Sequence, residues 1–317
     1  MLFGFLNVYK PVGMTSHDVV ANLRRVTKVK QIGHTGTLDP FAQGVLPIAI
    51  GKATRLIEYL DDEKEYLAEI SFGKSTNTYD CEGEAAFTSD LKVFQDAIIE
   101  SLKSFEGEIL QTPPIYSAIK VKGKKLYEYA RKGEEVEIEP RKVFIEKIEL
   151  KAFDEENQKA QVLIKCSKGT YIRSIAHDLG QNLGCGAHLS KLIRTQAGKF
   201  FVQDAIPLDN FGGASKDAPY NTEIVKKNII NPLDMLNFPQ LEINEDEQKK
   251  VLMGQAIEVN GKWKMENGKC HCEDFSASQL LSFSPKDHSH LVILVYNNNI
   301  SAVAQVSENL IKVKKVF

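Results

Sequence analysis

The stretch Gly33-His34-Thr35-Gly36-Thr37-Leu38-Asp39-Pro40 decides how this chain of 317 residues is interpreted. Its two glycines let the backbone turn sharply and let a ligand approach closely. Pro40 keeps Asp39 out of the helical region of backbone conformation, which fixes the acid on a turn. His34 is the only side chain within eight residues of Asp39 that could pair with it. A carboxylate held in this way is a candidate nucleophile or base, and an ordinary Asp-Pro turn is the plainer alternative.

Length and composition predict two domains with substantial cores, because 43% of the residues are hydrophobic and 26% are charged without long blocks of one sign. The formal net charge of −2 does not itself indicate a nucleic-acid binder, so any RNA contact must come from local clusters of Lys and Arg. Five mostly distant cysteines suit free thiols in a reducing compartment. We therefore expect a cytoplasmic protein with no signal peptide and no membrane span.

Hydrophobic periodicity predicts alternating strands and helices up to about residue 200. Strands are expected at 3–9, 45–50, 64–72, 142–150 and 160–166. Helices are expected after an N-cap at Thr15 or Ser16, after residue 52, over 91–105 with Gly107 as its stop, and up to Gly184. Residues 205–231 have a weaker pattern that predicts a loop or linker. Short strands and turns beyond about residue 238 predict a small β domain.

Residues 111–133 form a basic segment with interleaved aromatic side chains. Between residues 120 and 132 a single acid, Glu128, faces six cations: Lys120, Lys122, Lys124, Lys125, Arg131 and Lys132. Tyr127 and Tyr129 lie among them. Basic residues with aromatics suit a phosphate backbone with stacked bases. A solvated helix face anchored by two tyrosines explains the same pattern equally well.

Three other features bear on the chemistry. Arg173 falls in the first turn of a predicted helix, where a cation opposes the helix dipole, so we expect a carboxylate or phosphate partner; an unpaired surface arginine is the alternative. Tyr66 lies on an apolar strand face, where a core aromatic is the default and its phenol needs a partner. Cys270-His271-Cys272 is too tightly spaced for zinc. We expect no metal, nucleotide or redox cofactor.

The order and spacing of these motifs resemble the TruB family of tRNA pseudouridine synthases over roughly residues 2–200. The matching stretches are NVYKPVGMTS (7–16), GHTGTLDP (33–40), GVLPIAIGKATRL (44–56), KEY (64–66), PPIYSAIKVKGKKLYEYARKGE (113–134) and KGTYIRSIAHDLG (168–180). Residues 238–317 resemble a PUA domain less sharply. Residues 205–231 and 263–290 look like insertions, and Gln43 replaces a threonine typical of the family.

The resemblance implies an α+β pseudouridine synthase fold with a mixed, mainly antiparallel central sheet, followed by a small PUA-like β-barrel. The catalytic domain would cover residues 1–235 and the RNA-binding domain residues 238–317. The implied substrate is the uridine at position 55 in the T-loop of tRNA, flipped out of its stack. No obligate protein partner is implied. The alternatives are an RNA-binding or RNA-folding protein without turnover and a synthase that depends on a guide RNA.

The resemblance also implies roles for single residues. Asp39 would be the nucleophile, paired with Arg173, while the path of its intermediate stays open between attack on the base, attack on ribose C1′ and a glycal. Tyr66 would stack on the target base and help to remove its C5 proton, and Tyr171 would support the same pocket. His34 would fill the space that the uridine leaves. Lys10 and the basic segment would contact RNA.

Overall fold

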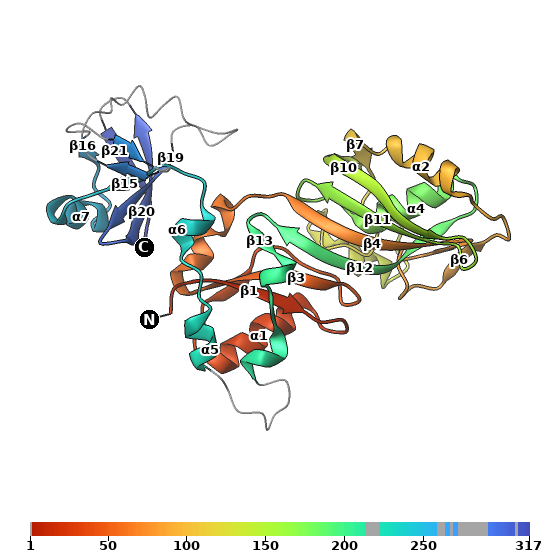
Figure 1. Cartoon of the computed structure of the whole chain (residues 1–317), viewed down its shortest axis with the longest axis horizontal. Coiled ribbons are helices and arrows are strands. Elements are labelled where there is room, and N and C mark those ends of the chain that lie inside the picture. Colours follow the sequence, from red (N-terminus) through yellow and green to blue (C-terminus); the bar gives the residue numbers. More distant parts are fainter. Residues whose placement is uncertain (1, 213–221, 259–263, 267–268, 272–290, 308–309) are drawn as a thin grey trace. The chain divides into compact units, whose positions relative to one another are not determined.

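The computed structural model describes residues 2–212, 222–258, 264–266, 269–271, 291–307 and 310–317 (Figure 1). The chain divides into two compact units, one formed by residues 1–54 and 61–229 and the other by residues 55–60 and 230–317. Within the described ranges, no helix has the length and apolar character that a membrane crossing requires.

A mixed, mainly antiparallel sheet of ten strands forms the first unit, in the order β14-β1-β3-β12-β4-β11-β10-β7, with β13 on β12 and β2 on β3. Its strands are β1 (Gly4–Lys10), β2 (Ile32–His34), β3 (Gln43–Ile50), β4 (Lys64–Phe72), β7 (Gly107–Gln111), β10 (Arg141–Asp154), β11 (Lys159–Cys166), β12 (Ala187–Ala197), β13 (Phe200–Phe201) and β14 (Ile206–Pro207). The β1–β14 and β3–β12 pairs are parallel. This architecture confirms the predicted α+β fold class.

Helices pack against both halves of this sheet (Figure 1). They are α1 (Ser16–Thr27), α2 (Gln95–Lys103), α3 (Leu126–Ala130), α4 (Ile172–Asn182) and α5 (Thr222–Lys227), with 3₁₀ turns η1 (Gly51–Tyr59), η2 (Val202–Asp204) and η3 (Leu208–Phe211). Two small hairpins pair β5 (Lys74–Thr76) with β6 (Ala85–Thr88) and β8 (Lys120–Val121) with β9 (Lys124–Lys125). Helix α1 begins at the predicted N-cap, since Thr15 and Asp18 form a capping box.

The second unit is a seven-stranded sheet in the order β16-β21-β20-β19-β15-β18-β17. Its elements are α6 (Pro232–Met235), β15 (Gln240–Glu242), α7 (Glu245–Leu252), β16 (Ile257–Glu258), β17 (Lys264–Glu266), β18 (Lys269–His271), β19 (Leu291–Tyr296), β20 (Asn299–Ser307) and β21 (Leu310–Val316). The sheet curls as a half-barrel over a separate core that includes Leu241, Val251, Leu294 and Ile311. Sequence analysis expected short strands in this part of the chain but not helix α7.

The helix predicted over residues 91–105 is shorter than expected. Helix α2 begins after Phe94, whose backbone is extended, and the side chains of Leu91 and Phe94 are 54% and 61% exposed. The spacing of these two apolar residues fits a helix, which is why the prediction began at residue 91, but the backbone there is not helical. Gly107 is not the stop of the helix but the first residue of β7, with φ at +88°. The helix predicted after residue 52 is the 3₁₀ turn η1.

Residues 206–211 are not a linker. Strand β14 pairs with β1 through Val8 and Ile206, and the side chains of Leu208 and Phe211 are buried in the main core. Helix α5 buries Val225 in the same core. The described part of 205–231 is therefore integral to the first unit, and residues 213–221 lie outside the described residues.

Most of the second expected insertion, 263–290, also lies outside the described residues, apart from β17 and β18. The prediction against a zinc site falls partly there, because Cys272 is not described. Cys81, Cys166 and Cys185 are free thiols, which agrees with the expectation for those three residues.

Candidate active site

A cavity of about 650 Å³ in the first unit brings together residues that are far apart in the sequence. The four residues predicted to carry the chemistry all line it: Asp39, Tyr66, Tyr171 and Arg173. The central position of β12 between β3 and β4 explains part of this convergence, because Arg194 of β12 pairs in register with Gly44 on one side and Tyr66 on the other. The site is therefore built across the middle of the sheet.

The loop that carries Asp39 is braced from the start of the chain. Ser16 at the beginning of α1 binds both backbone groups of Leu38: its hydroxyl accepts from the amide at 2.8 Å and donates to the carbonyl at 3.2 Å. The Pro40 carbonyl accepts from the Gly13 amide at 2.8 Å. These contacts fix the backbone on both sides of the candidate nucleophile.

Lys10 belongs to this bracing. Its side chain is fully buried, and its ammonium donates to the carbonyls of Pro11 at 2.8 Å, Met14 at 2.6 Å and Pro40 at 3.3 Å. Burial lowers the pKa of Lys10 to about 8. Lys10 thus helps to hold the Asp39 loop, and its contact with RNA stays a prediction.

The partner of Asp39 is Arg173, at the start of α4. The guanidinium Nε lies 3.0 Å from Asp39 Oδ2, and Nη2 donates to Asp39 Oδ1 at 3.4 Å. The Nε–H is not directed well enough for a hydrogen bond, so the shorter contact is ionic. Nη2 also donates to the Tyr116 carbonyl at 3.1 Å. The partner that we expected for Arg173, at the start of a helix, is therefore a carboxylate.

Asp80 is a second carboxylate on Arg173, and sequence analysis missed it. Its Oδ2 lies 3.1 Å from Arg173 Nη1, and both side chains are almost fully buried. Asp80 is itself held through Oδ1, which accepts from the Thr78 hydroxyl at 2.5 Å and from the Glu82 amide at 3.1 Å. Arg173 is thus fixed between two carboxylates.

Burial and charge act in opposite directions on Asp39. Burial raises the pKa of its carboxyl above the ordinary value and Asp80 adds to the shift, whereas the Arg173 guanidinium and Lys10 lower it. We conclude that Arg173 favours the ionised carboxylate that a nucleophile requires, against the cost of taking a charge out of water.

Tyr66 has its phenol partner in Arg194. The side chain of Tyr66 is 9% exposed, and burial raises the pKa of the phenol while Arg194 lowers it. Arg194 is 1% exposed and donates to three carbonyls: Val45 at 2.7 Å, Gly36 at 3.1 Å and Thr37 at 3.4 Å. This arginine therefore joins the tyrosine to the Asp39 loop.

The close approach of β3 and β12 requires a glycine at position 44. Its φ is +107°, and a Cβ there would lie 2.3 Å from the Arg194 carbonyl oxygen. Any other residue would push the strand of Arg194 away from the loop.

Comparison with known proteins shows the family of the chain. Residues 24–172 match the model of the TruB family pseudouridylate synthase N-terminal domain, and residues 173–236 match that of the tRNA pseudouridylate synthase B C-terminal domain. The chain is 46% identical over 264 residues to tRNA pseudouridine synthase B of Heliobacterium modesticaldum, covering 82% of this chain and 83% of the relative. The chain belongs to the TruB family of pseudouridylate synthases.

Other relatives agree with this assignment. The TruB-family chain is 46% identical over 266 residues to tRNA pseudouridine synthase B of Carboxydothermus hydrogenoformans, covering 82% of this chain and 87% of that one. Among solved structures, an H/ACA RNP bound to a substrate RNA containing 2'-deoxyuridine has a TM-score of 0.66 at 25% identity, covering 99% of this chain and 85% of the other. A Cbf5-Nop10-Gar1 complex gives 0.66 at 27% identity, covering 99% and 84%.

The basic segment of the TruB-family chain is a hairpin followed by a short helix, not the continuous helix face that we weighed as an alternative. We call residues 120–125 the basic hairpin; Lys122 and Gly123 form its turn with φ at +50° and +85°. Tyr127 of α3 lines the cavity, with Lys125 and Arg131 over its ring at 5.4 and 5.3 Å. Lys132 lies 3.9 Å from Glu134. The segment thus reaches the site through Tyr127.

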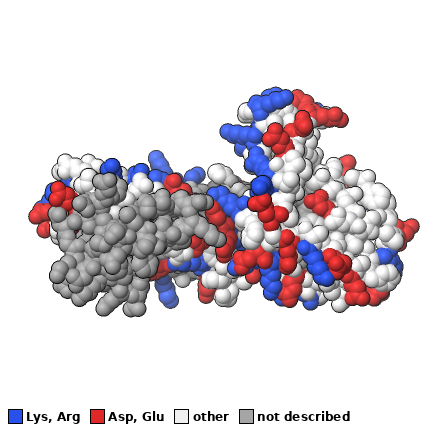
Figure 2. All heavy atoms as spheres, turned by 90° about the horizontal axis from the view of Figure 1, so that it is seen from above, with Lys and Arg blue, Asp and Glu red and all other residues white. Residues whose placement is uncertain are grey.

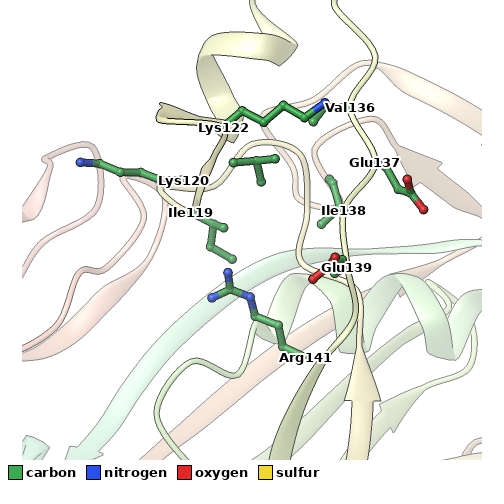
Figure 3. A pocket seen from close by; sticks show the side chains of 9 residues that line it. Ile119, Lys120, Lys122, Val136, Glu137, Ile138, Glu139 and Arg141 are labelled. Atoms are coloured by element: carbon green, nitrogen blue, oxygen red, sulfur yellow. The ribbon is translucent and has the colours of Figure 1, made fainter.

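Lys120 and Lys122 do not line the Asp39 cavity but a second hollow of about 320 Å³. Figure 3 shows Lys122 extending toward Val136 and the Arg141 guanidinium pointing toward Ile119. Over the described part of the face in Figure 2, basic and acidic side chains are interspersed. No broad field of one sign is visible there, which agrees with the net charge of −2. RNA contacts of this hairpin stay a prediction.

His34 lies at the end of β2 and does not line the cavity. Burial lowers the pKa of its imidazole, and Nδ1 is buried with no hydrogen-bond partner among the described residues. Tyr171 precedes α4, where its amide donates to Gln111 Oε1 at 2.7 Å and its carbonyl accepts from Gln111 Nε2 at 3.0 Å. Among the described residues, no hydrogen bond or ion pair joins His34 to Asp39.

Proposed function

We propose that this chain converts the uridine at position 55 in the T-loop of tRNA into pseudouridine, with Asp39 as the nucleophile and without a cofactor. One observation carries the proposal: the Asp39 carboxylate faces a cavity beside Tyr66 and is held by a buried arginine at 3.0 Å. Membership of a pseudouridylate synthase family supports the reaction. The names of relatives that are 42–46% identical support tRNA as the substrate.

The reaction breaks the bond between ribose C1′ and uracil N1, turns the base and joins C1′ to C5. The C5 proton is lost and N1 takes up a proton, so the product is an isomer of the substrate. Asp39 attacks the flipped nucleotide, and Arg173 holds the carboxylate ionised and aimed at it. Tyr66 stacks on the base and helps to remove its C5 proton. Burial raises the pKa of the Tyr66 phenol, and the Arg194 guanidinium opposes that shift. The base must leave its stack to reach these groups, and a cavity of about 650 Å³ can accommodate it.

We further propose that the basic hairpin grips the T-arm and that the second unit is a PUA-like RNA-binding domain. The hairpin supports this because its Lys125 lies over the ring of Tyr127, which lines the cavity. For the second unit, the support is its curled sheet and the resemblance of residues 238–317 to a PUA domain. A stand-alone enzyme is favoured over a guide-dependent one, because the relatives named tRNA pseudouridine synthase B are more similar than the proteins of the RNP complexes.

Incubation of the purified protein alone with an unmodified tRNA transcript, followed by mapping of pseudouridine, tests this function. We expect modification at position 55. The Asp39→Asn variant should bind tRNA about as tightly as the parent and form no product, because it keeps the side-chain shape and lacks the anionic nucleophile. Asp96→Asn, at an exposed acid of α2, is the matched control.

The alternatives predict different results. Binding without turnover by the parent would indicate an RNA-folding protein. Turnover that appears only when a guide RNA is added would indicate a guide-dependent synthase. Normal product formation by Asp39→Asn would overturn the assignment of the nucleophile.

A further inference from the structure

One wall of the cavity carries more positive charge than its own acids neutralise. Lys64, Lys168 and Arg194 line this wall, and Asp62 is the only carboxylate among the cavity-lining residues there. Arg194 is satisfied by backbone carbonyls, which are polar but uncharged. The Asp62 carboxylate lies 3.3 Å from the Lys168 ammonium and is thereby engaged. The wall therefore carries two cations, Arg194 and Lys64, that no carboxylate of the wall neutralises.

Lys64 is the less satisfied of these two cations. Its ammonium donates to the carbonyls of Asp62 at 3.2 Å and Glu63 at 3.4 Å, and no described carboxylate lies within 4.0 Å of it. The neighbouring acid Glu63 is directed elsewhere, to Lys165 at 3.6 Å. Partial burial together with Arg194 and Lys168 lowers the pKa of Lys64 to about 8, an environment that an anion would relieve.

The position of Lys64 places this charge next to the reacting nucleotide. Lys64 is the first residue of β4 and Tyr66 is the third, so both side chains project from the same face of the strand. Lys64 Cε would lie 3.9 Å from a Cβ at Gly36, three residues before Asp39. A ligand that stacks on Tyr66 and meets Asp39 must therefore pass close to this ammonium.

We propose that Lys64 binds an RNA phosphate adjacent to the flipped uridine, with Lys168 beside it. This inference rests on the proposed function. The uracil and ribose are uncharged, so the anions that accompany a flipped nucleotide are its flanking phosphates. A compact ammonium is suited to a phosphate as a point charge. Lys64 would then anchor the backbone while Tyr66 holds the base.

Binding to a T-arm stem-loop in which single phosphates are replaced by neutral methylphosphonates tests the proposal. At one position next to the target uridine, the replacement should weaken binding by the parent about tenfold. The same replacement should not weaken Lys64→Met further, because that variant has no ammonium to bind the phosphate. Lys64→Arg should keep the sensitivity, since it keeps the charge. The salt dependence of Lys64→Met should fall by about one phosphate contact.

Lys103→Met is the control, because Lys103 is an exposed residue of α2, and it should behave as the parent. Equal sensitivity of the parent and Lys64→Met at every position would overturn the proposal. Abolished turnover in Lys64→Met with no phosphate coupling would do the same, and would indicate proton transfer instead. If Lys64→Met does not fold, binding by the parent is sufficient as a test. Parent binding that no methylphosphonate near the uridine weakens would refute the contact. The phosphate coupling is measured by binding alone, so it can be tested even if the parent forms no pseudouridine, a result that would count against the proposed function and not against this contact.

Discussion

The two buried arginines of the cavity have opposite partners. Arg173 is held between the carboxylates of Asp39 and Asp80 at 3.0 and 3.1 Å, while Arg194 donates to three backbone carbonyls. The first arrangement neutralises charge and shifts the pKa of the proposed nucleophile, Asp39. The second fixes a loop and leaves its positive charge uncompensated. Arg173 is thus placed to act on the proposed nucleophile. Arg194 holds the loop in place, and its positive charge is available to attract an anion.

The largest expected effect is the loss of turnover when Arg173, the arginine held by two carboxylates, is changed. Arg173→Lys keeps the charge but loses the planar fork that contacts Asp39, Asp80 and the Tyr116 carbonyl together. Single-turnover rates at saturating enzyme should fall roughly a hundredfold, or about 2.7 kcal/mol of transition-state stabilisation. Affinity for tRNA should change much less. An unchanged rate would show that the fork does not aim the nucleophile.

Arg194→Lys should act mainly on stability. A lysine cannot serve three separate carbonyls, so at least one buried acceptor loses its partner, at a cost of about 2 kcal/mol in the free energy of unfolding. Urea denaturation would measure the destabilisation. Lys191→Arg, at an exposed position of the same strand, is the control. If unfolding is unaffected while turnover collapses, the contrast between the two arginines is wrong.

The basic hairpin should affect affinity without affecting chemistry. Changing Lys122, Lys124 and Lys125 together to Ala should lower the salt slope of tRNA binding by up to about three, one for each phosphate that the variant no longer binds. Single-turnover rates at saturation should stay those of the parent. The exposed set Lys92, Lys103 and Lys151 serves as the control. Unchanged salt dependence would show that the hairpin is a solvated surface that contacts no phosphate.

The smallest expected effect is a shift of the acidic limb of the pH–rate profile. The limb should lie above the ordinary pKa of an aspartate, because burial raises the pKa of Asp39 and the reaction needs its ionised form. Arg173→Gln removes a charge that lowers this pKa, so its limb should move to higher pH. Asp80→Asn removes a charge that raises it, so its limb should move to lower pH. Shifts in the same direction would contradict the assignment of Asp39.

Sequence analysis succeeded where signals are local. The N-cap at Thr15, the strands at Gly4–Lys10 and Lys64–Phe72 and the Gly-flanked Asp39 loop are each encoded within a few neighbouring residues. Four predicted residues consequently line one cavity.

What sequence analysis missed depends on distant partners. Strand β12 was not predicted because register shifts at Leu189/Lys191 and Arg194/Gln196 interrupt the alternation of its buried residues, one of which is the charged Arg194. Asp80 lies in a polar loop, where an acid is common. Its partner Arg173 is 93 residues away in the sequence and contacts it only in the folded chain. Neither position carries a local signal that separates it from an ordinary surface residue.

The position of β12 between β3 and β4 also limits when the sheet can form during synthesis. During synthesis, Asp39, Tyr66 and Arg173 all leave the ribosome before residues 187–197 do. Until that strand arrives, β1 and β3 form one sheet fragment and β4, β11, β10 and β7 another, each with an open edge that could pair with a neighbouring chain. Closure across such sequence separations is slow. A nascent chain stalled before residue 187 would thus hold the proposed nucleophile and its arginine but lack the strand that joins the two fragments.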